Sequence, residues 1–173
     1  HDFRGNTIEA FKGAGWVHWG EVAIDKCPQA QAIRTKAHAL MFKTMKKDAA
    51  QIRPGLADYI LLFKKPGENE AAIKRPIDNE EWIEWAHPIW YGIRESDTLQ
   101  KAEAREDDDE AHICPLQLGT IERCVKLWSN EGEVVFSPFA GIGSEIYQAL
   151  KMGRRGLGIE LKRSYWRAGV KNL

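Results

Sequence analysis

The sequence lacks any long run of hydrophobic residues. Its longest uninterrupted apolar stretch runs only from Tyr59 to Phe63, whereas a membrane-spanning helix needs about 20 residues. The opening His1-Asp-Phe-Arg-Gly has neither the basic nor the apolar region of a secretory signal, and no initiating methionine. We therefore expect no membrane partner, and we expect the sequence to begin within a longer protein.

Cysteine is scarce. Cys27, Cys114 and Cys124 show no paired spacing, which argues against a disulfide framework and against a zinc ribbon. His112 and Cys114 are two potential metal ligands without clear partners, whereas zinc takes four. We expect no metal site and a reducing, cytoplasmic setting.

An excess of charge of one sign is also missing, because 25 basic residues balance 25 acidic ones. The balance is uneven along the chain. Residues 26–75 hold 11 Lys or Arg against 4 Asp or Glu, residues 76–111 hold 3 against 12, and residues 112–173 hold 9 against 5. Since local fields steer a polyanion, the neutral total does not exclude a nucleic-acid partner.

The first 63 residues alternate between helical and strand patterns. Asn6, with Glu9 three residues later, is typical of a helix start. The segment after Gln29 has apolar residues at helical spacing, with Lys36, Lys43 and Lys47 on another face. A nearly all-apolar run from Ala57 is typical of a strand buried on both faces. The predicted elements are a helix over 6–14, a strand over 16–24, a helix over 29–47 and a strand over 57–63.

Residues 64–111 have no clean periodicity, and we expect an irregular inserted region with short helices. It concentrates Trp82, Trp85, Trp90 and Tyr91, and it ends in the acidic run 106–110. These aromatic residues could stack on or wedge between bases. The alternative is a small local core, and the helical spacing of Trp82 and Trp85 favours that alternative for these two residues.

Residues 112–173 predict a βαβ unit and therefore a parallel sheet. Pro115 suits the first turn of a helix, whose apolar positions include Leu118, Ile121, Val125 and Trp128. The elements that follow are a strand over 133–136, a helix over 144–152, a strand over 155–159 and a helix from 164 onward.

A glycine-rich turn, Ser137-Pro-Phe-Ala-Gly-Ile-Gly-Ser144, joins the first of these strands to its helix. Ligands of open α/β sheets bind at such turns, where glycine lets them approach the backbone. Glu160 ends the next strand, where an acidic side chain accepts hydrogen bonds from ribose hydroxyls. Together they predict a nucleoside ligand. The alternative is that the glycines only form a tight turn and that Glu160 only faces water. Ile146 stands where a dinucleotide fingerprint has Gly or Ala, and no nucleoside-triphosphate loop is present.

The sequence resembles the N6-adenine and N4-cytosine DNA methyltransferases of the permuted kind, whose cofactor motif lies near the C-terminus. The resemblance rests on Val135-Phe-Ser-Pro-Phe-Ala-Gly-Ile-Gly-Ser144, Met152-Gly-Arg-Arg-Gly-Leu-Gly-Ile-Glu-Leu161 and His112-Ile-Cys-Pro-Leu-Gln-Leu118. Asp58-Tyr-Ile-Leu-Leu-Phe-Lys-Lys-Pro-Gly67 resembles the family's middle section, particularly in phage-related members. The resemblance as a whole implies an α/β, Rossmann-like sheet and S-adenosylmethionine as cofactor. The implied parts are a piece of the catalytic subdomain (1–63), a target-recognition insertion (64–111) and a cofactor-binding unit (112–173).

The resemblance also implies the cofactor contacts. Glu160 would bind the ribose. Ser137 stands where many members have Asp, so we do not expect it to make the charged contact that the Asp makes near the methionine ammonium. Cys114 stands where many members have Lys. The residues expected around the methionine portion and along the pocket border are Pro138, Phe139, Gly141, Gly143, Ser144, His112, Ile113, Cys114 and Pro115.

No Pro-Pro pair occurs in the sequence. The family transfers the methyl group with an Asp/Asn/Ser-Pro-Pro-aromatic tetrapeptide, whose aromatic ring stacks on the flipped base. The resemblance therefore implies a fragment of a site-specific methyltransferase that acts on double-stranded DNA, with no catalytic residue of its own and completed by an N-terminal half. The alternative is a catalytically inactive nucleotide-binding or DNA-binding module of the same fold.

Five lysines are candidates for contacts with DNA phosphates, and Trp90 is a candidate for contact with the bases. Neutralised phosphates release counterions, which makes such binding salt-dependent. A basic helix face that is merely solvated is an equally good interpretation. The candidate lysines are Lys43, Lys46, Lys47, Lys64 and Lys65.

Overall fold

The computed structural model describes residues 2–74, 77–100 and 114–173. They form two compact units. The first unit consists of residues up to 68 together with 83–92, and the second consists of residues 69–82 and 93–173. Each unit is a mixture of helices and strands, as expected for an α/β protein.

The first unit is built on a three-stranded sheet in the order β2-β1-β3. Strand β1 (Val17–Ile24) pairs antiparallel with β2 (Asp58–Lys64), and the register runs from Val17 opposite Lys64 to Ile24 opposite Asp58. The short strand β3 (Ile89–Trp90) runs parallel to the end of β1. Helix α1 (Phe3–Gly13) packs on the pair, with the Phe11 ring stacked on Phe63 at 4.4 Å between centroids. The strands predicted over 16–24 and 57–63 are therefore confirmed.

Three details of the first unit differ from the sequence predictions. Helix α1 begins earlier than expected, because the Asp2 carboxylate accepts a hydrogen bond from the Gly5 N–H at 2.8 Å and so caps it in place of Asn6. Strand β2 is half-buried and its Tyr59 is exposed, so burial on both faces is wrong for the described residues. The third difference is the helix predicted over 29–47.

The structure divides that range into three short elements, and a fourth follows it. The Lys36 backbone adopts φ 53°, the left-handed conformation that ends a helix. Because the chain turns there, Lys36, Lys43 and Lys47 do not share one helix face, and the prediction of a continuous basic stripe is wrong. The elements are α2 (Pro28–Thr35), the 3₁₀ turn η1 (His38–Leu40), α3 (Phe42–Lys47) and the 3₁₀ turn η2 (Ala49–Gln51).

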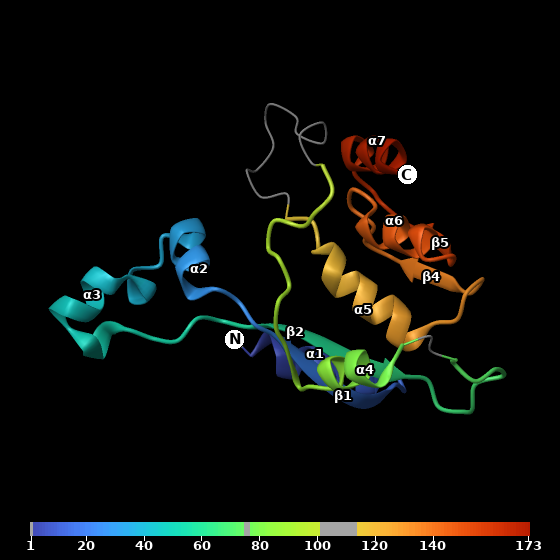
Figure 1. Ribbon diagram of the computed structural model, residues 1–173, viewed down its shortest axis with the longest axis horizontal. Helices are drawn as coiled ribbons and strands as arrows, with labels where there is room; N and C mark the ends of the chain where they lie inside the picture. The colour runs from blue at the N-terminus through green and yellow to red at the C-terminus, as the bar shows by residue number, and fades with distance from the viewer. Residues whose placement is uncertain (1, 75–76, 101–113) are drawn as a thin grey trace. The chain divides into compact units, whose positions relative to one another are not determined.

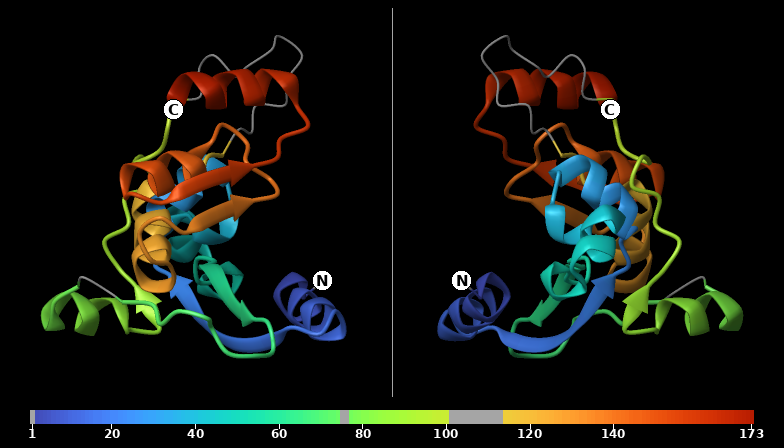
Figure 2. Two further views of the ribbon diagram at one scale, coloured as in Figure 1. Left: turned by 90° about the vertical axis from the view of Figure 1, so that its right-hand side faces the viewer. Right: turned by 90° about the vertical axis from the view of Figure 1, so that its left-hand side faces the viewer.

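The second unit contains the predicted βαβ arrangement. Strands β4 (Val134–Ser137) and β5 (Arg155–Gly158) are parallel, as the arrows in Figure 2 show, and Phe136 lies opposite Leu157. Helix α6 (Ser144–Lys151) connects them and packs through Ile146 over Gly156 and Gly158. The parallel sheet is therefore confirmed.

Two further helices complete the second unit. Helix α5 (Leu118–Trp128) begins after Gln117, so Pro115 precedes the helix and does not lie in its first turn as predicted. Its buried residues include Ile121 and Val125. Helix α7 (Arg163–Asn172) ends the chain (Figure 1).

The described residues between 64 and 111 contain the short helix α4 (Asn79–Trp85), as expected of an insertion with short helices. They also contain β3, which was not predicted and belongs to the β1 sheet. Trp85 is buried, whereas Trp82 is 50% exposed, so the local core predicted for both holds only for Trp85. The acidic run at 106–110 lies outside the described residues. The division into catalytic, target-recognition and cofactor-binding parts remains a prediction.

Candidate functional site

The glycine-rich turn lies between β4 and α6, where the sequence predicts a ligand. Gly141 has φ 54° and Gly143 has φ 87°, conformations that strain any residue with a side chain. The Gly143 N–H donates to the Ala140 carbonyl at 2.8 Å, and the Ala140 N–H donates to the Ile159 carbonyl at 2.9 Å. The turn is thereby fixed to the residue that follows β5.

The Glu160 carboxylate is held beside this turn by two main-chain amides. Its Oε2 accepts from the Gly141 N–H at 2.8 Å, and its Oε1 accepts from the Lys162 N–H at 2.7 Å. An ionised carboxylate offers about four acceptor sites. Two sites therefore remain for further donors such as ribose hydroxyls.

Two hollows lie against the turn and share Ala140 and Gly141. The first hollow, about 200 Å³, is bordered by Glu160, by the glycines of β5 and by residues of α7 that include Trp166. The second hollow, about 220 Å³, is bordered by Cys114, Pro115, Phe139, Ser144, Glu145 and Tyr165, among others. A ligand with two chemically different ends fits this arrangement, with one end on each side of the glycine backbone.

The structure brings most of the predicted cofactor residues to these hollows. Cys114, Pro115, Phe139 and Ser144 border the second hollow, and Gly143 and Glu160 border the first. Phe139 is 86% exposed. Ser137 is buried and Pro138 is exposed, and neither lines either hollow. His112 and Ile113 lie outside the described residues.

Glu145 and Tyr165 were missed by the sequence interpretation. Both border the second hollow. Burial raises the pKa of the Glu145 carboxyl above its ordinary value, since desolvation disfavours the charged form. The available signal was an acidic residue directly after the glycine turn. Tyr165 gave none, because only the packing of α7 brings it to the turn.

The candidate nucleic-acid contacts fall into separate groups. Lys43, Lys46 and Lys47 are exposed on α3. At the end of β2, the Lys64 ammonium lies 3.4 Å from the Trp19 ring centroid and the Lys65 ammonium 5.5 Å from that of Trp16.

Trp90 does not fit a base-stacking role. It is 1% exposed, and its indole N–H donates to the Trp85 carbonyl at 2.9 Å. Its ring faces are taken up by packing, so its assignment as a nucleic-acid contact is corrected to a core residue.

Within the described ranges, no three His, Cys, Asp or Glu side chains gather as a metal site would require. The same ranges contain no helix long and apolar enough to cross a membrane. Burial raises the pKa of the Cys124 thiol to about 12, so this thiol stays protonated and unreactive at neutral pH.

The sequence matches a protein family over almost its whole length. The family model described as DNA methylase, covering the N6 and N4 types, matches residues 5–171. The chain belongs to the DNA methylase family. This methylase chain is 31% identical over 117 residues to the type II methyltransferase M.BglI of Bacillus subtilis, covering 67% of the chain and 30% of that protein. It is 25% identical over 130 residues to M.HindIII of Haemophilus influenzae, covering 72% of the chain and 42% of that protein.

Solved structures of similar fold include a putative DNA modification methylase from Thermus thermophilus. That likeness has a TM-score of 0.69 at 22% identity, covering 99% of the methylase chain and 59% of the Thermus chain. The same Thermus protein solved with S-adenosyl-L-methionine gives a TM-score of 0.64. These likenesses establish the Rossmann-like methyltransferase fold. The chain spans about a third of the length of the curated relatives it matches.

Proposed function

We propose that this chain binds S-adenosylmethionine as the cofactor part of a methyltransferase that modifies the exocyclic amine of adenine or cytosine in double-stranded DNA. The observation that carries the proposal is the pair of hollows on either side of Gly141. A ribose fits the hollow bordered by Glu160, because its hydroxyls can donate to the free acceptor sites of that carboxylate. The methionine portion fits the hollow bordered by Ser144.

The second hollow also offers a partner for the methionine ammonium. Ser137 carries no charge at a position where the family resemblance implies an acid, and it is buried outside the hollow. We assign the ammonium contact to Glu145, which is one of the residues that border this hollow. A bound ammonium favours the ionised carboxylate and so offsets the desolvation that raises its pKa.

Binding and transfer are separate properties of this chain. Methyl transfer from sulfur to an amine is a direct displacement that depends on positioning and desolvation. The sequence contains no Pro-Pro pair, so we propose that these 173 residues bind the cofactor without transferring its methyl group. A catalytically inactive binding module of the same fold is the second candidate, and the same absence favours it.

Calorimetry with S-adenosylmethionine tests the cofactor assignment. We expect Glu160→Ala to weaken binding about tenfold or more, because hydrogen bonds to charged groups contribute roughly 1.5–3 kcal/mol. Gly141→Ala should also weaken binding, because its methyl group meets no protein atom within 4 Å and would enter the ligand space.

Gly132→Ala is the matched control for Gly141→Ala. It has the same sign of φ, 78°, and equally open surroundings, but it lies outside both hollows. Equal affinity in wild type and a Gly141→Val, Glu160→Ala double variant would show the assignment to be wrong. Tritium transfer from labelled cofactor to duplex DNA by the pure chain would overturn the separation of binding from transfer.

A further inference from the structure

A long excursion between β1 and β2 is not explained by cofactor binding. Ile24 and Asp58 are directly paired, yet the chain between them runs through α2, η1, α3 and η2. We call residues 26–57 the arm. In Figure 1 its helices α2 and α3 extend away from the β1–β2 pair.

Nearly all charged side chains of the arm are positive. Its acidic side chain, Asp48, is engaged locally, because it accepts hydrogen bonds from the Ala50 N–H and from Gln51 Nε2. Lys26 is also engaged, since its ammonium lies 2.5 Å from the Asp58 carboxylate and its side chain is buried. The remaining cations of the arm are exposed: Arg34, Lys36, Lys43, Lys46, Lys47 and Arg53. Such a surface is complementary to a polyanion.

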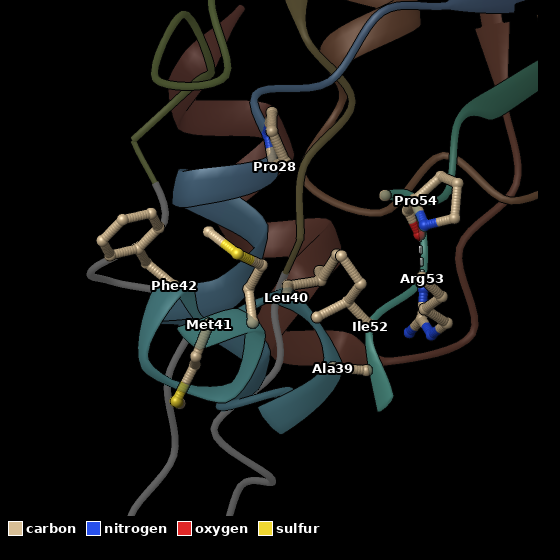
Figure 3. Close-up of a pocket in the computed structure, with 10 residues that line it drawn as sticks. Pro28, Ala39, Leu40, Met41, Phe42, Ile52, Arg53 and Pro54 are labelled. Atoms are coloured by element: carbon tan, nitrogen blue, oxygen red, sulfur yellow. Dashed lines mark hydrogen bonds between the residues drawn. The ribbon is translucent and has the colours of Figure 1, made fainter. Parts of the chain in front are cut away.

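Large apolar side chains are exposed among these cations. Phe42 is 67% exposed and Ile33 is 74% exposed. The Lys46 ammonium lies 5.3 Å from the Phe42 ring centroid. Phe42 borders an apolar hollow of about 470 Å³ together with Leu40 and Ile52, and in Figure 3 its ring points away from these two side chains. Phe42 is thus an exposed ring with the Lys46 ammonium group beside it.

This combination fits duplex DNA better than a protein or lipid surface. Protein interfaces exclude lysine from their centre, whereas here Lys43 adjoins Phe42 in sequence. Many helices that lie in a membrane surface are about 20–30 residues long, whereas α3 spans only Phe42–Lys47. Proteins that bend or open DNA bind phosphates with Lys and Arg and insert an apolar wedge between base steps.

The arm also starts at the edge of the sheet where ligands bind. It leaves β1 at its carboxyl end, which is also the carboxyl end of the parallel strand β3. Lys64 and Lys65 lie at the opposite end of the β1–β2 pair, since Val17 is paired with Lys64. The arm cations and these two lysines therefore belong to different surfaces.

We propose that the arm binds duplex DNA, with Lys43, Lys46 and Lys47 on phosphates and Phe42 inserted between base pairs beside the nucleotide to be extruded. This inference rests on the proposed function and adds its DNA-contacting element. Extruding a base requires unstacking, and a wedge that fills the opened step lowers the free energy of the extruded state. Lys64 and Lys65 take no part.

The phosphate contacts are tested by the salt dependence of binding to a short DNA duplex. For a Lys43→Gln, Lys46→Gln, Lys47→Gln variant we expect the slope of log affinity against log salt to fall by about two to three, since each contact contributes about 0.9. The matched control, Lys64→Gln with Lys65→Gln, should leave the slope unchanged. The reverse pattern would overturn the proposal.

The wedge is tested with a duplex that contains 2-aminopurine, whose fluorescence rises on unstacking. The wild-type chain should raise the signal, Phe42→Ala should abolish the rise, and Phe42→Leu should retain part of it. The exposed Phe3 on α1 provides the control, and Phe3→Ala should behave as wild type. An unchanged rise in Phe42→Ala would contradict the wedge.

If the arm bound a different partner, the experiments would give different results. Tighter binding to anionic phospholipid vesicles than to DNA would overturn the proposal, and so would self-association that Phe42→Ala abolishes. Cofactor calorimetry on the same variants separates the two proposals. Normal S-adenosylmethionine binding with no arm-dependent DNA binding refutes only the arm, because both hollows lie in the second unit; an unchanged circular dichroism spectrum shows that each variant is folded.

Discussion

At the residue scale, two glycines of β5 allow helix α6 to lie close against the sheet. A methyl group added to Gly158 would stand 2.8 Å from the Ala140 Cβ and 2.8 Å from the Ile146 Cδ1. Gly158→Ala should therefore lower the free energy of unfolding by about 1–3 kcal/mol, as overpacking does. Urea denaturation measures this change.

Gly119 in α5 is the matched control, because an added methyl group meets nothing within 4 Å there. Gly119→Ala should raise the free energy of unfolding by up to about 1 kcal/mol, since alanine loses less backbone entropy in a helix. Equal effects of the two substitutions would contradict the close approach of α6 to β5.

Glu145 connects stability to pH. Because burial raises its pKa in the folded chain, the folded state binds more protons than the unfolded state between the ordinary and the raised pKa. Its contribution to stability is therefore lost as pH rises through that window. Glu145→Gln should be more stable than wild type at pH 7, with the difference closing below the ordinary glutamate pKa. Thermal melts across pH measure this.

The same substitution should weaken S-adenosylmethionine binding at pH 7, because the amide cannot neutralise the methionine ammonium. Higher stability with lower affinity is the signature of a buried acid kept for a ligand. If Glu145→Gln instead gains stability and keeps its affinity, the ammonium contact lies elsewhere.

At the scale of elements, β3 is held by its tryptophan. Trp90→Phe removes the indole N–H that donates to the Trp85 carbonyl, which should destabilise the chain by roughly 1–3 kcal/mol. Trp82→Phe, at a half-exposed site, should change stability by less than about 0.5 kcal/mol. Denaturant titrations compare them. A large fall in DNA affinity for Trp90→Phe without loss of stability would restore it as a base contact.

The elements that sequence predicts well here are those whose cause is local. The turn from Ser137 to Ser144 and its flanking strand and helix follow from glycine chemistry and from apolar periodicity over a few residues. The break of the arm at Lys36 could not be predicted, because no glycine marks that left-handed residue. Strand β3 depends on pairing with β1, which lies far away in sequence, and the second hollow depends on the packing of Tyr165.

For the whole molecule, the two compact units should respond differently to cofactor. Both hollows lie in the second unit, so S-adenosylmethionine at a hundred times its dissociation constant should stabilise that unit by about 2.7 kcal/mol. Hydrogen exchange should slow in β4, β5 and α6 and stay unchanged in β1 and β2. Equal slowing throughout would mean that the units unfold together.

The hydrogen bond from the Gly141 N–H to Glu160 joins the two hollows through a single peptide. Two separate small molecules, adenosine and methionine, would therefore meet a shared loop rather than independent sites. Occupation of one hollow fixes the peptide that the other uses, so the fragments should bind cooperatively and each should raise the affinity of the other by the same factor. An inhibitor that links both fragments would gain from this coupling as well as from its larger contact area.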